Sequence, residues 1–299
     1  MMLSEADALA LLEACSNRDR WGASDQRGTL NLITRERRRR ALAEVQAGDV
    51  VALGRALVTR GSSQVPPSAF HIMTTLGPNE ISAQDLLILT PHGFEMTHVD
   101  AVGHSFWGGR SYNGRRAEDV VGPEGLRSGG IDAMGGGIVT RCVLLDVAAA
   151  RGVEHLRAGD GISAHDLDAA EEIACVRVEA GDAVMVRSGL GLRVARGEPD
   201  TTDPREGLLA DAVAWLFRRD VSVYAGDCIE RLPSGYARLP MPLHQIGLAA
   251  MGLCILDCPD VESLAATARA HGRNAFLLVI APLRIPGGTA SPVNPLAIF

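Results

Sequence analysis

The chain has 299 residues, of which 46% are apolar, and a formal net charge of −7 at pH 7. The acidic balance argues against a nucleic-acid-binding protein, whose surface must be basic. The apolar fraction is ample for a buried core. Every basic side chain is an arginine, so chemistry that needs a lysine nucleophile or Schiff base is excluded.

Helical and strand patterns alternate along the chain. Apolar spacing predicts helices at 5–15 and at 35–45, the second capped by Thr34. Further patterns predict strands at 50–57, 137–147, 182–188, 220–225 and 275–285, and helices at 164–173, 205–219, 244–251 and 261–271. The glycine-rich residues 122–137 are expected to form a loop. This order predicts an α/β protein with a mixed sheet, folded as a single domain over 1–299.

Several features concern compartment and partners. The first residues are acidic and lack a continuous apolar stretch, so no export signal is predicted. No run reaches the roughly 18 apolar residues of a membrane span. The six cysteines form no CxxC pair and are expected to be buried free thiols. We therefore expect a cytoplasmic protein with no membrane partner, and we interpret the arginines at 37–40 as a solvated helix face.

The segment from Thr97 to His104 carries the strongest chemical signal. His98 and Asp100 are two residues apart, so an extended backbone would point both side chains to the same face. Gly103 would allow the chain to bend and return His104 toward this pair. An imidazole and a carboxylate aimed together are typical ligands of zinc or manganese. The alternative is a turn of ordinary satisfied polar residues.

Two more candidate groups lie later in the chain. His244 begins a helical stretch and Asp257 follows it, although a lone histidine at a helix start is more often a cap or a core residue. Asp227 and Glu230 follow a predicted strand and could add a carboxylate to a pocket or pair with an arginine. There is no nucleophile elbow, phosphate-binding loop or dinucleotide fingerprint.

With these residues in view, the chain resembles the cyclase-like metal-dependent hydrolases, which include bacterial kynurenine formamidase and isatin hydrolase. Their signature is His-x-Gly-Thr-His-x-Asp-x-x-x-His, and residues 97–104 match its second half. Further landmarks span nearly the whole chain: Arg20-Trp21-Gly22, Gly28-Thr29-Leu30-Asn31, Tyr112-Asn113-Gly114, Leu144-Leu145-Asp146-Val147, Val186-Arg187-Ser188-Gly189 and the glycine-rich segment 287–295. The resemblance implies a mixed-sheet, swivelling β/β/α fold.

The resemblance also implies roles for individual residues. His98 and Asp100 match metal ligands of the family, and His104 matches the histidine that transfers protons. His244 matches the distal ligand, and Asp257 stands where the family has a glutamate ligand. The expected cofactor is one divalent metal, Zn²⁺ or Mn²⁺, held by the first pair and by one or both of the later residues. A site without metal is the alternative.

The first half of the signature departs from the family. Phe94 stands in place of the first histidine and Met96 in place of the glycine, and neither is an ordinary zinc ligand. His92 is nearby, but six residues of straight strand would put it about 20 Å from His98. Only a bend, which Gly93 could permit, would bring it back. The two-metal site of the formamidases is therefore not expected.

Aromatic residues follow the histidine segment in a chain that is only 4% aromatic. Phe106, Trp107 and Tyr112 could form a wall for a flat or cyclic substrate, or they could be ordinary packing. Trp21, at the start of the family landmarks, and Phe94, at the altered signature position, complete the candidate substrate contacts.

The resemblance implies hydrolysis of an amide, imide or lactam C–N bond of a small cyclic or aromatic substrate by a metal-activated water, with a homodimer or homotetramer as the assembly. A cyclase or dehydratase that closes a ring in a polyketide-like product of secondary metabolism is the second hypothesis, because a metal that polarises a carbonyl also stabilises an enolate. A ligand-binding relative without turnover is the third hypothesis.

Overall fold

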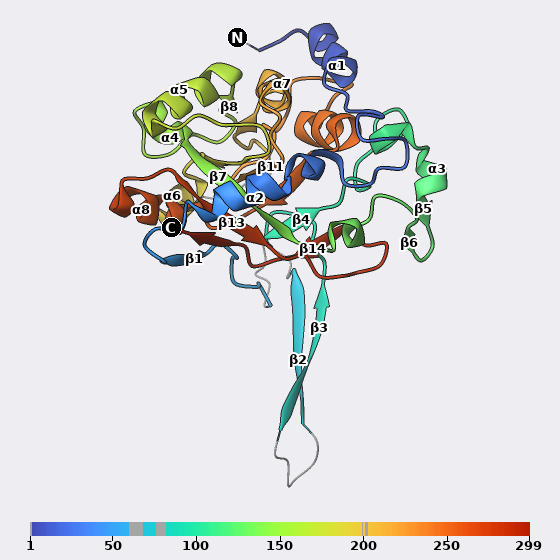
Figure 1. Ribbon diagram of the computed structural model, residues 1–299, viewed down its shortest axis with the longest axis horizontal. Coiled ribbons are helices and arrows are strands. Elements are labelled where there is room, and N and C mark those ends of the chain that lie inside the picture. Colours follow the sequence, from blue (N-terminus) through green and yellow to red (C-terminus); the bar gives the residue numbers. More distant parts are fainter. Residues whose placement is uncertain (1, 60–67, 76–81, 199, 201–202) are drawn as a thin grey trace.

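A nine-stranded sheet forms the centre of the protein (Figure 1). The structure is a computed structural model that describes residues 2–59, 68–75, 82–198, 200 and 203–299. Along the sheet the strands lie in the order β1 (Val50–Ala52), β15 (Leu296–Ile298), β13 (Ala275–Ile280), β7 (Ile138–Asp146), β9 (Ala183–Arg187), β11 (Val223–Gly226), β12 (Cys254–Asp257), β4 (His98–Asp100) and β14 (Ala290–Pro292).

The middle of this sheet is parallel and its two flanks are antiparallel. Strands β7, β9, β11 and β12 run parallel, whereas β1, β15 and β13 on one side and β4 and β14 on the other pair antiparallel. A parallel centre must be covered on both faces, and every residue of β9 is indeed buried. The predicted α/β class with a mixed sheet is confirmed.

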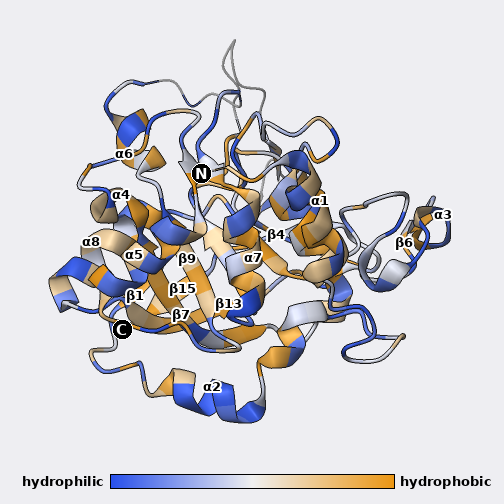
Figure 2. Ribbon diagram, turned by 90° about the horizontal axis from the view of Figure 1, so that it is seen from above, coloured by the Kyte–Doolittle hydropathy of each residue, from blue (hydrophilic) through white to orange (hydrophobic). Residues whose placement is uncertain are grey.

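Alternate side chains of the central strands feed two separate cores. In β9, Val184 and Val186 pack with the helices α1 (Glu5–Ala14), α5 (Ala164–Ala174) and α7 (Ala210–Arg218) on one face. Ala183 and Met185 point the other way, toward α8 (Val261–His271). Figure 2 shows the resulting pattern, with hydrophobic strands inside and hydrophilic helix surfaces outside.

The shorter elements connect these layers. They are the helices α2 (Arg35–Leu42), α3 (Ala117–Val120), α4 (Val147–Ala150) and α6 (Leu190–Ala195), the 3₁₀ turns η1 (Gly28–Leu32), η2 (Tyr112–Gly114) and η3 (Ile131–Met134), the π-helix η4 (Leu243–Met251), and the strand pairs β2 (Ala69–Thr75) with β3 (Ala83–Leu89), β5 (Val121–Gly122) with β6 (Gly125–Leu126), and β8 (Gly161–Ile162) with β10 (Gly207–Leu208). No helix of the described residues is long and apolar enough to cross a membrane.

Most predicted elements are present, with shorter bounds. Helix α2 begins after Thr34, whose side chain accepts the N–H of Arg37 as the cap prediction requires. The predicted helix at 205–219 begins only at Ala210, because Gly207 and Leu208 pair with Gly161 and Ile162. The predicted strands at 50–57 and 275–285 end at Ala52 and Ile280. The loop predicted at 122–137 contains the hairpin β5–β6 and the turn η3.

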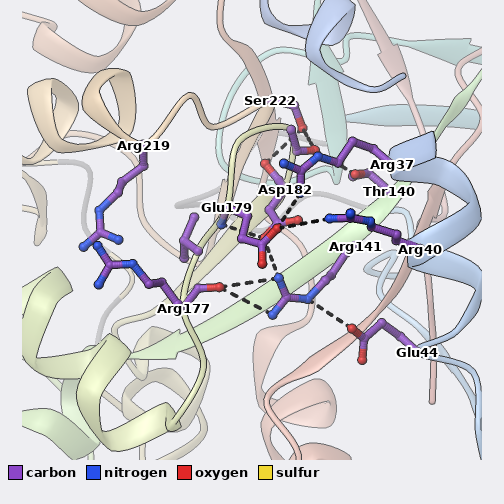
Figure 3. Close-up of polar contacts among 12 residues, drawn as sticks. Arg37, Arg40, Glu44, Thr140, Arg141, Arg177, Glu179, Asp182, Arg219 and Ser222 are labelled. Atoms are coloured by element: carbon purple, nitrogen blue, oxygen red, sulfur yellow. Dashed lines mark hydrogen bonds and ion pairs between the residues drawn. The ribbon is translucent and has the colours of Figure 1, made fainter. Parts of the chain in front are cut away.

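Two arginines of α2, Arg37 and Arg40, have acidic partners within the chain. Arg37 is 2.5 Å from Glu179, and Arg40 lies 3.1 Å from Glu36 and 3.9 Å from Glu179 (Figure 3). Arg38, Arg39 and Arg40 are exposed, whereas the Arg37 side chain is only 27% exposed. The interpretation as a solvated helix face is therefore correct for residues 38–40, whereas Arg37 helps to fix α2 against the rest of the protein.

Strands β2 and β3 form a hairpin that projects away from the body (Figure 1). We call its described residues, 69–75 and 83–89, the arm. Neither strand of the arm joins another sheet. The sequence patterns did not predict the arm, because β2 and β3 have apolar residues on both faces and do not alternate cleanly between apolar and polar residues.

The packing of the core predicts a stability difference between two leucines. Leu145 of β7 is fully buried, so Leu145→Ala should lower the free energy of unfolding by about 2–5 kcal/mol by leaving a cavity. Leu42 at the end of α2 is 57% exposed, and Leu42→Ala should change the same quantity by less than about 0.5 kcal/mol. Urea unfolding of both variants measures the difference, and equal losses would contradict the assigned core.

Candidate metal site

The site is built on β4, a strand of three residues at the antiparallel flank of the sheet. Its middle residue, Val99, points into the core on the α8 side. His98 and Asp100 must therefore point to the other face, where Nε2 of His98 lies 3.5 Å from Oδ1 of Asp100. Both side chains are almost completely buried, which confirms the extended backbone expected for this pair.

Strand β12 places Asp257 directly beside this pair. Asp257 is the register partner of His98, and its Oδ2 lies 3.7 Å from Nε2 of His98. Thr97 fixes the junction, because its hydroxyl donates a hydrogen bond of 2.7 Å to the carbonyl of Cys258 and accepts one of 2.9 Å from the N–H of Arg55. The predicted carboxylate is therefore brought to the site by strand pairing.

The π-helix η4 brings the distal histidine. Nε2 of His244 lies 3.7 Å from Oδ2 of Asp100. Its Nδ1 faces Glu230, whose two carboxylate oxygens are both 2.9 Å away, and Glu230 also accepts the backbone N–H of His244 at 3.2 Å. Glu230 is fully buried, so it orients the imidazole rather than pairing with an arginine. Asp227 instead accepts backbone N–H groups of Ser188, Gly189 and Leu190.

His92 also belongs to the site, although a straight strand would have kept it away. Gly93 adopts φ +117°, a conformation that side chains rarely allow, and the chain turns back there. Nδ1 of His92 lies 3.3 Å from Oδ1 of Asp100, and its Nε2 is 2.9 Å from the hydroxyl of Thr289. His92 therefore stands beside the same carboxylate as His98, although the family signature has its first histidine at the position of Phe94.

His104 closes the cluster on the side of His92. The two imidazole rings stack at 3.9 Å between centroids with an interplanar angle of 13°. The backbone N–H of His104 donates to the carbonyl of Ala101 at 2.9 Å, which is the turn predicted after Asp100. One possible ligand atom from each of Asp100, His104 and His244 lies within 4.8 Å of the other two, and the same holds for His92, His98 and Asp100.

The donor set fits a divalent cation. Among the described residues, neither carboxylate oxygen of Asp100 has a hydrogen-bond partner, and Oδ1 of Asp257 has none either. A buried carboxylate without hydrogen bonds is costly unless a positive charge compensates it. Imidazole nitrogens and carboxylate oxygens together suit zinc or manganese. The expected ligand set of His98, Asp100, His244 and Asp257 is thus brought together, and His92 joins it.

Burial and charge shift the pKa values of these groups. Burial alone would raise the pKa of Asp100, but the surrounding histidines outweigh it and hold that pKa below its usual value. Burial and the charge of Asp100 raise the pKa of Asp257 to about 6. Burial would lower the pKa of His244, yet the Glu230 carboxylate raises it to about 10. Burial lowers the pKa of His104 to about 4, and the attraction of Asp100 only partly opposes this shift.

The predicted aromatic residues differ in their surroundings. Tyr112 is fully buried and donates a hydrogen bond of 3.0 Å to Asp25, so its position is one of packing. Trp107 packs partly against the core and lines a surface cavity of about 160 Å³ beside α1. Trp21 lies under the guanidinium of Arg20 at 4.9 Å.

The two remaining aromatic residues stay closer in sequence to the site. Phe94 is half-buried, and the guanidinium of Arg205 lies 4.1 Å from its ring centroid. Phe106 is also half-buried. Each of them is two residues from a histidine of the cluster, His92 or His104.

Sequence reasoning missed two contributors to the site. The bend at Gly93 could have been suspected from the glycine, but only the fold shows that it returns His92 to Asp100. Glu230 was one of two carboxylates with no preferred partner. The twelve residues between Glu230 and η4, 231–242, gave no sign of the contact between Glu230 and His244.

Comparison with known proteins agrees with this architecture. A family model described as "Putative cyclase" matches residues 87–230, which include β4 and both His92 and His104. Over these residues the chain is similar to the putative cyclase family. The resemblance to the cyclase-like metal-dependent hydrolases is thereby confirmed, while no curated protein matches the chain.

Solved structures extend the similarity over the whole fold. The crystal structure of a novel cyclase is 27% identical, with a TM-score of 0.85 over 95% of this chain and 99% of that one. An isatin hydrolase bound to the product analogue thioisatinate is 18% identical, with a TM-score of 0.61 over 86% of this chain and 93% of that one. Isatin hydrolase A from Ralstonia solanacearum is 20% identical, with a TM-score of 0.56 over 83% and 91%. The two hydrolases share the fold.

The environment of His104 predicts an unusual titration. Its pKa is about 4 in the folded chain, against about 6.5 in an unfolded one, so the ring stays neutral at pH 7. Between these two values the unfolded state binds more protons, and His104 should therefore destabilise the fold increasingly as the pH falls from 6.5 to 4. In His104→Gln the part of the stability loss that comes from His104 should disappear.

Two measurements on the metal-free protein check this titration. NMR should show the His104 ring, assigned with His104→Gln, titrating well below pH 6. Urea unfolding at pH 7 and pH 5 should show a smaller loss of stability for the variant than for the wild type. A ring that titrates near pH 6.5 would contradict the assigned burial.

Proposed function

We propose that this chain is a metal-dependent hydrolase that cleaves an amide, imide or lactam C–N bond of a small cyclic or aromatic substrate. The observation that carries the proposal is the buried carboxylate of Asp100, which has no hydrogen bond among the described residues and lies among the rings of His92, His98 and His244. A cation bound among these rings would compensate the buried charge of this carboxylate.

The residues that would hold the cation are His92, His98 and Asp100, with Asp257 and His244 beside them. Zn²⁺ or Mn²⁺ suits this mixture of nitrogen and oxygen donors. What the cation supplies when bound is Lewis acidity toward a carbonyl oxygen and toward a water molecule. With a cation bound, Glu230 would hold the proton of His244 on Nδ1 and leave Nε2 to face the cation.

His104 is the group that would move protons. Its low pKa leaves the ring neutral at pH 7, so it can accept a proton from an attacking water and pass it to the departing nitrogen. Stacking on His92 fixes the plane of the ring. Phe94 and Phe106 would contact the flat substrate.

Ring closure is the second candidate function. The observation in its favour is the similarity over nearly the full length to a structure described as a novel cyclase. The same residues would then stabilise an enolate instead of a tetrahedral intermediate, and His104 would remove a proton from carbon.

The test of the proposed function combines metal removal with a substrate panel. The protein is stripped with a chelator, reloaded with Zn²⁺ or Mn²⁺, and assayed on N-formylkynurenine, isatin, simple lactams and cyclic imides. We expect turnover of at least one C–N substrate that depends on the added metal. His104→Gln should keep the metal and lower kcat by about 10²- to 10⁴-fold.

A histidine outside the cluster serves as the control. His155 is half-buried and far along the chain from β4, and His155→Gln should leave kcat unchanged. A metal-loaded protein that hydrolyses none of the panel but cyclises polyketide-like precursors would favour the cyclase instead. Metal binding without any turnover would leave the ligand-binding relative.

The position of Glu230 predicts a separate effect on metal affinity. Glu230→Gln removes the charge that fixes and activates His244, so the Kd for Zn²⁺ should rise by about 10- to 100-fold. Glu171 of α5 is a second buried glutamate and pairs with Arg219. Glu171→Gln should leave the Kd for Zn²⁺ unchanged. Competition with a chromophoric chelator measures both constants, and an unchanged Kd for Glu230→Gln would rule out this positioning role.

A further inference from the structure

A cavity of about 410 Å³ lies on the α8 side of the sheet, and its volume is in the range of small-molecule sites. Its walls are residues 54–56 after β1, helix α6, and residues 259–262 at the start of α8. Helix α8 packs against both α6 and β1, so these three segments lie together (Figure 1). Among the described residues, no histidine and no carboxylate of the candidate metal site lines this cavity.

Hydrogen bonds hold two of these walls in place. The N–H of Asp260 donates to the carbonyl of Leu53 at 2.7 Å, which joins the start of α8 to the chain after β1. The N–H of Arg55 donates to the hydroxyl of Thr97 at 2.9 Å. Because these bonds exist without a ligand, a molecule that enters the cavity would lose little affinity to the ordering of the backbone.

Four carboxylates line the cavity, and each of them already has a partner at 2.5 to 3.1 Å. The pairs are Asp227 with the N–H groups of residues 188–190, Glu262 with Arg187, Asp200 with Arg205, and Asp260 with the N–H of Ser263. The negative charges around the cavity are therefore compensated within the protein, and they do not require a cationic ligand.

Arg55 is the exception among the charged residues of the cavity. Its side chain is half-buried, and among the described residues its guanidinium has no hydrogen bond and no ion pair. The rest of the lining is largely apolar and comes from Ala56, Leu190, Val194, Pro259 and Val261. The cavity thus offers one uncompensated positive charge beside an apolar wall.

We propose that this cavity binds a small monocarboxylate with an apolar body, whose carboxylate pairs with the guanidinium of Arg55. The planar guanidinium matches a carboxylate with two parallel hydrogen bonds. A phosphate monoester fits less well, because it carries about two negative charges and the four surrounding carboxylates would repel it. The proposal does not depend on the reaction that the metal site catalyses.

The proposed site is separate from the metal site. Phe94, Cys258 and Asp227 line a gap that is too small for a water molecule, and Asp227 also lines the cavity. Phe94 is two residues after His92 and Cys258 directly follows Asp257, so these side chains stand between the cavity and the metal site. A carboxylate paired with Arg55 would therefore not reach a cation bound by the histidines.

Fluorine NMR titration of the full chain with 4-fluorobenzoate tests the proposal, with 4-fluorobenzamide as the uncharged probe. The wild type should bind the benzoate at least about 10-fold more tightly than the benzamide. Arg55→Gln should raise the Kd for the benzoate by about 10- to 100-fold, because it removes a charged hydrogen-bond partner. Arg39→Gln removes the same charge from an exposed residue of α2 and should leave that Kd unchanged.

A second variant tests the cavity without changing its charge. Ala56→Phe keeps Arg55 and fills space in the cavity, so it should also raise the Kd for 4-fluorobenzoate by at least about 10-fold. Thermal unfolding confirms that each variant is folded. Hexanoate, an aliphatic carboxylate, should displace the benzoate from the wild type.

The metal separates this site from carboxylate binding at the cation. Removal of the metal with a chelator should change the Kd for 4-fluorobenzoate by less than about 3-fold. Binding that is lost with the metal and kept in Arg55→Gln would overturn the proposal, because the carboxylate would then bind the cation. Equal affinities for benzoate and benzamide would also overturn it, as would the absence of benzoate and hexanoate binding up to about 10 mM.

Discussion

The carboxylate of Asp100 imposes the main constraint on this structure. It is buried, and it has no hydrogen bond among the described residues. Imidazoles approach both of its oxygens and hold its pKa below the usual value. A charge in this position destabilises a fold unless positive charge surrounds it. The elements near this end of the sheet supply that compensation, because each of them places a side chain beside Asp100.

Each neighbour reaches Asp100 by a different structural device. His98 shares a face with Asp100 because side chains of strand β4 alternate every two residues. Asp257 lies beside them because β12 pairs with β4 in this register. His244 comes from a π-helix, a rare element that is common at functional sites, and Glu230 fixes its ring. His92 arrives through the left-handed turn at Gly93. The loss of the first signature histidine at Phe94 is thus accompanied by an imidazole from two residues earlier in the chain.

The sequence was sufficient for the elements with long periodic patterns. Helix α5 was predicted from its apolar spacing, and its start is fixed by the capping box of Ser163 and Asp166, a local interaction. Strands β4 and β12 are three and four residues long, too short for periodicity to reveal them. The pairing that joins them connects residues about 160 positions apart, which no local rule can predict.

The site shows the same division between local and distant information. His98, Asp100 and His104 were predicted because all three lie in one short segment, where their spacing can be read directly from the sequence. His244 and Asp257 were expected only from family resemblance, and the structure places both beside Asp100. For Tyr112 the sequence left a substrate contact and ordinary packing open, and the structure shows it buried and hydrogen-bonded to Asp25.

The most direct measurement is an anomalous difference map from crystals of the zinc-loaded protein, recorded on both sides of the zinc absorption edge. The account predicts a peak in contact with Asp100 and His98, on the side that faces His92 and His244. A protein that binds zinc elsewhere, or crystals that show Asp100 surrounded only by water and protein, would contradict it.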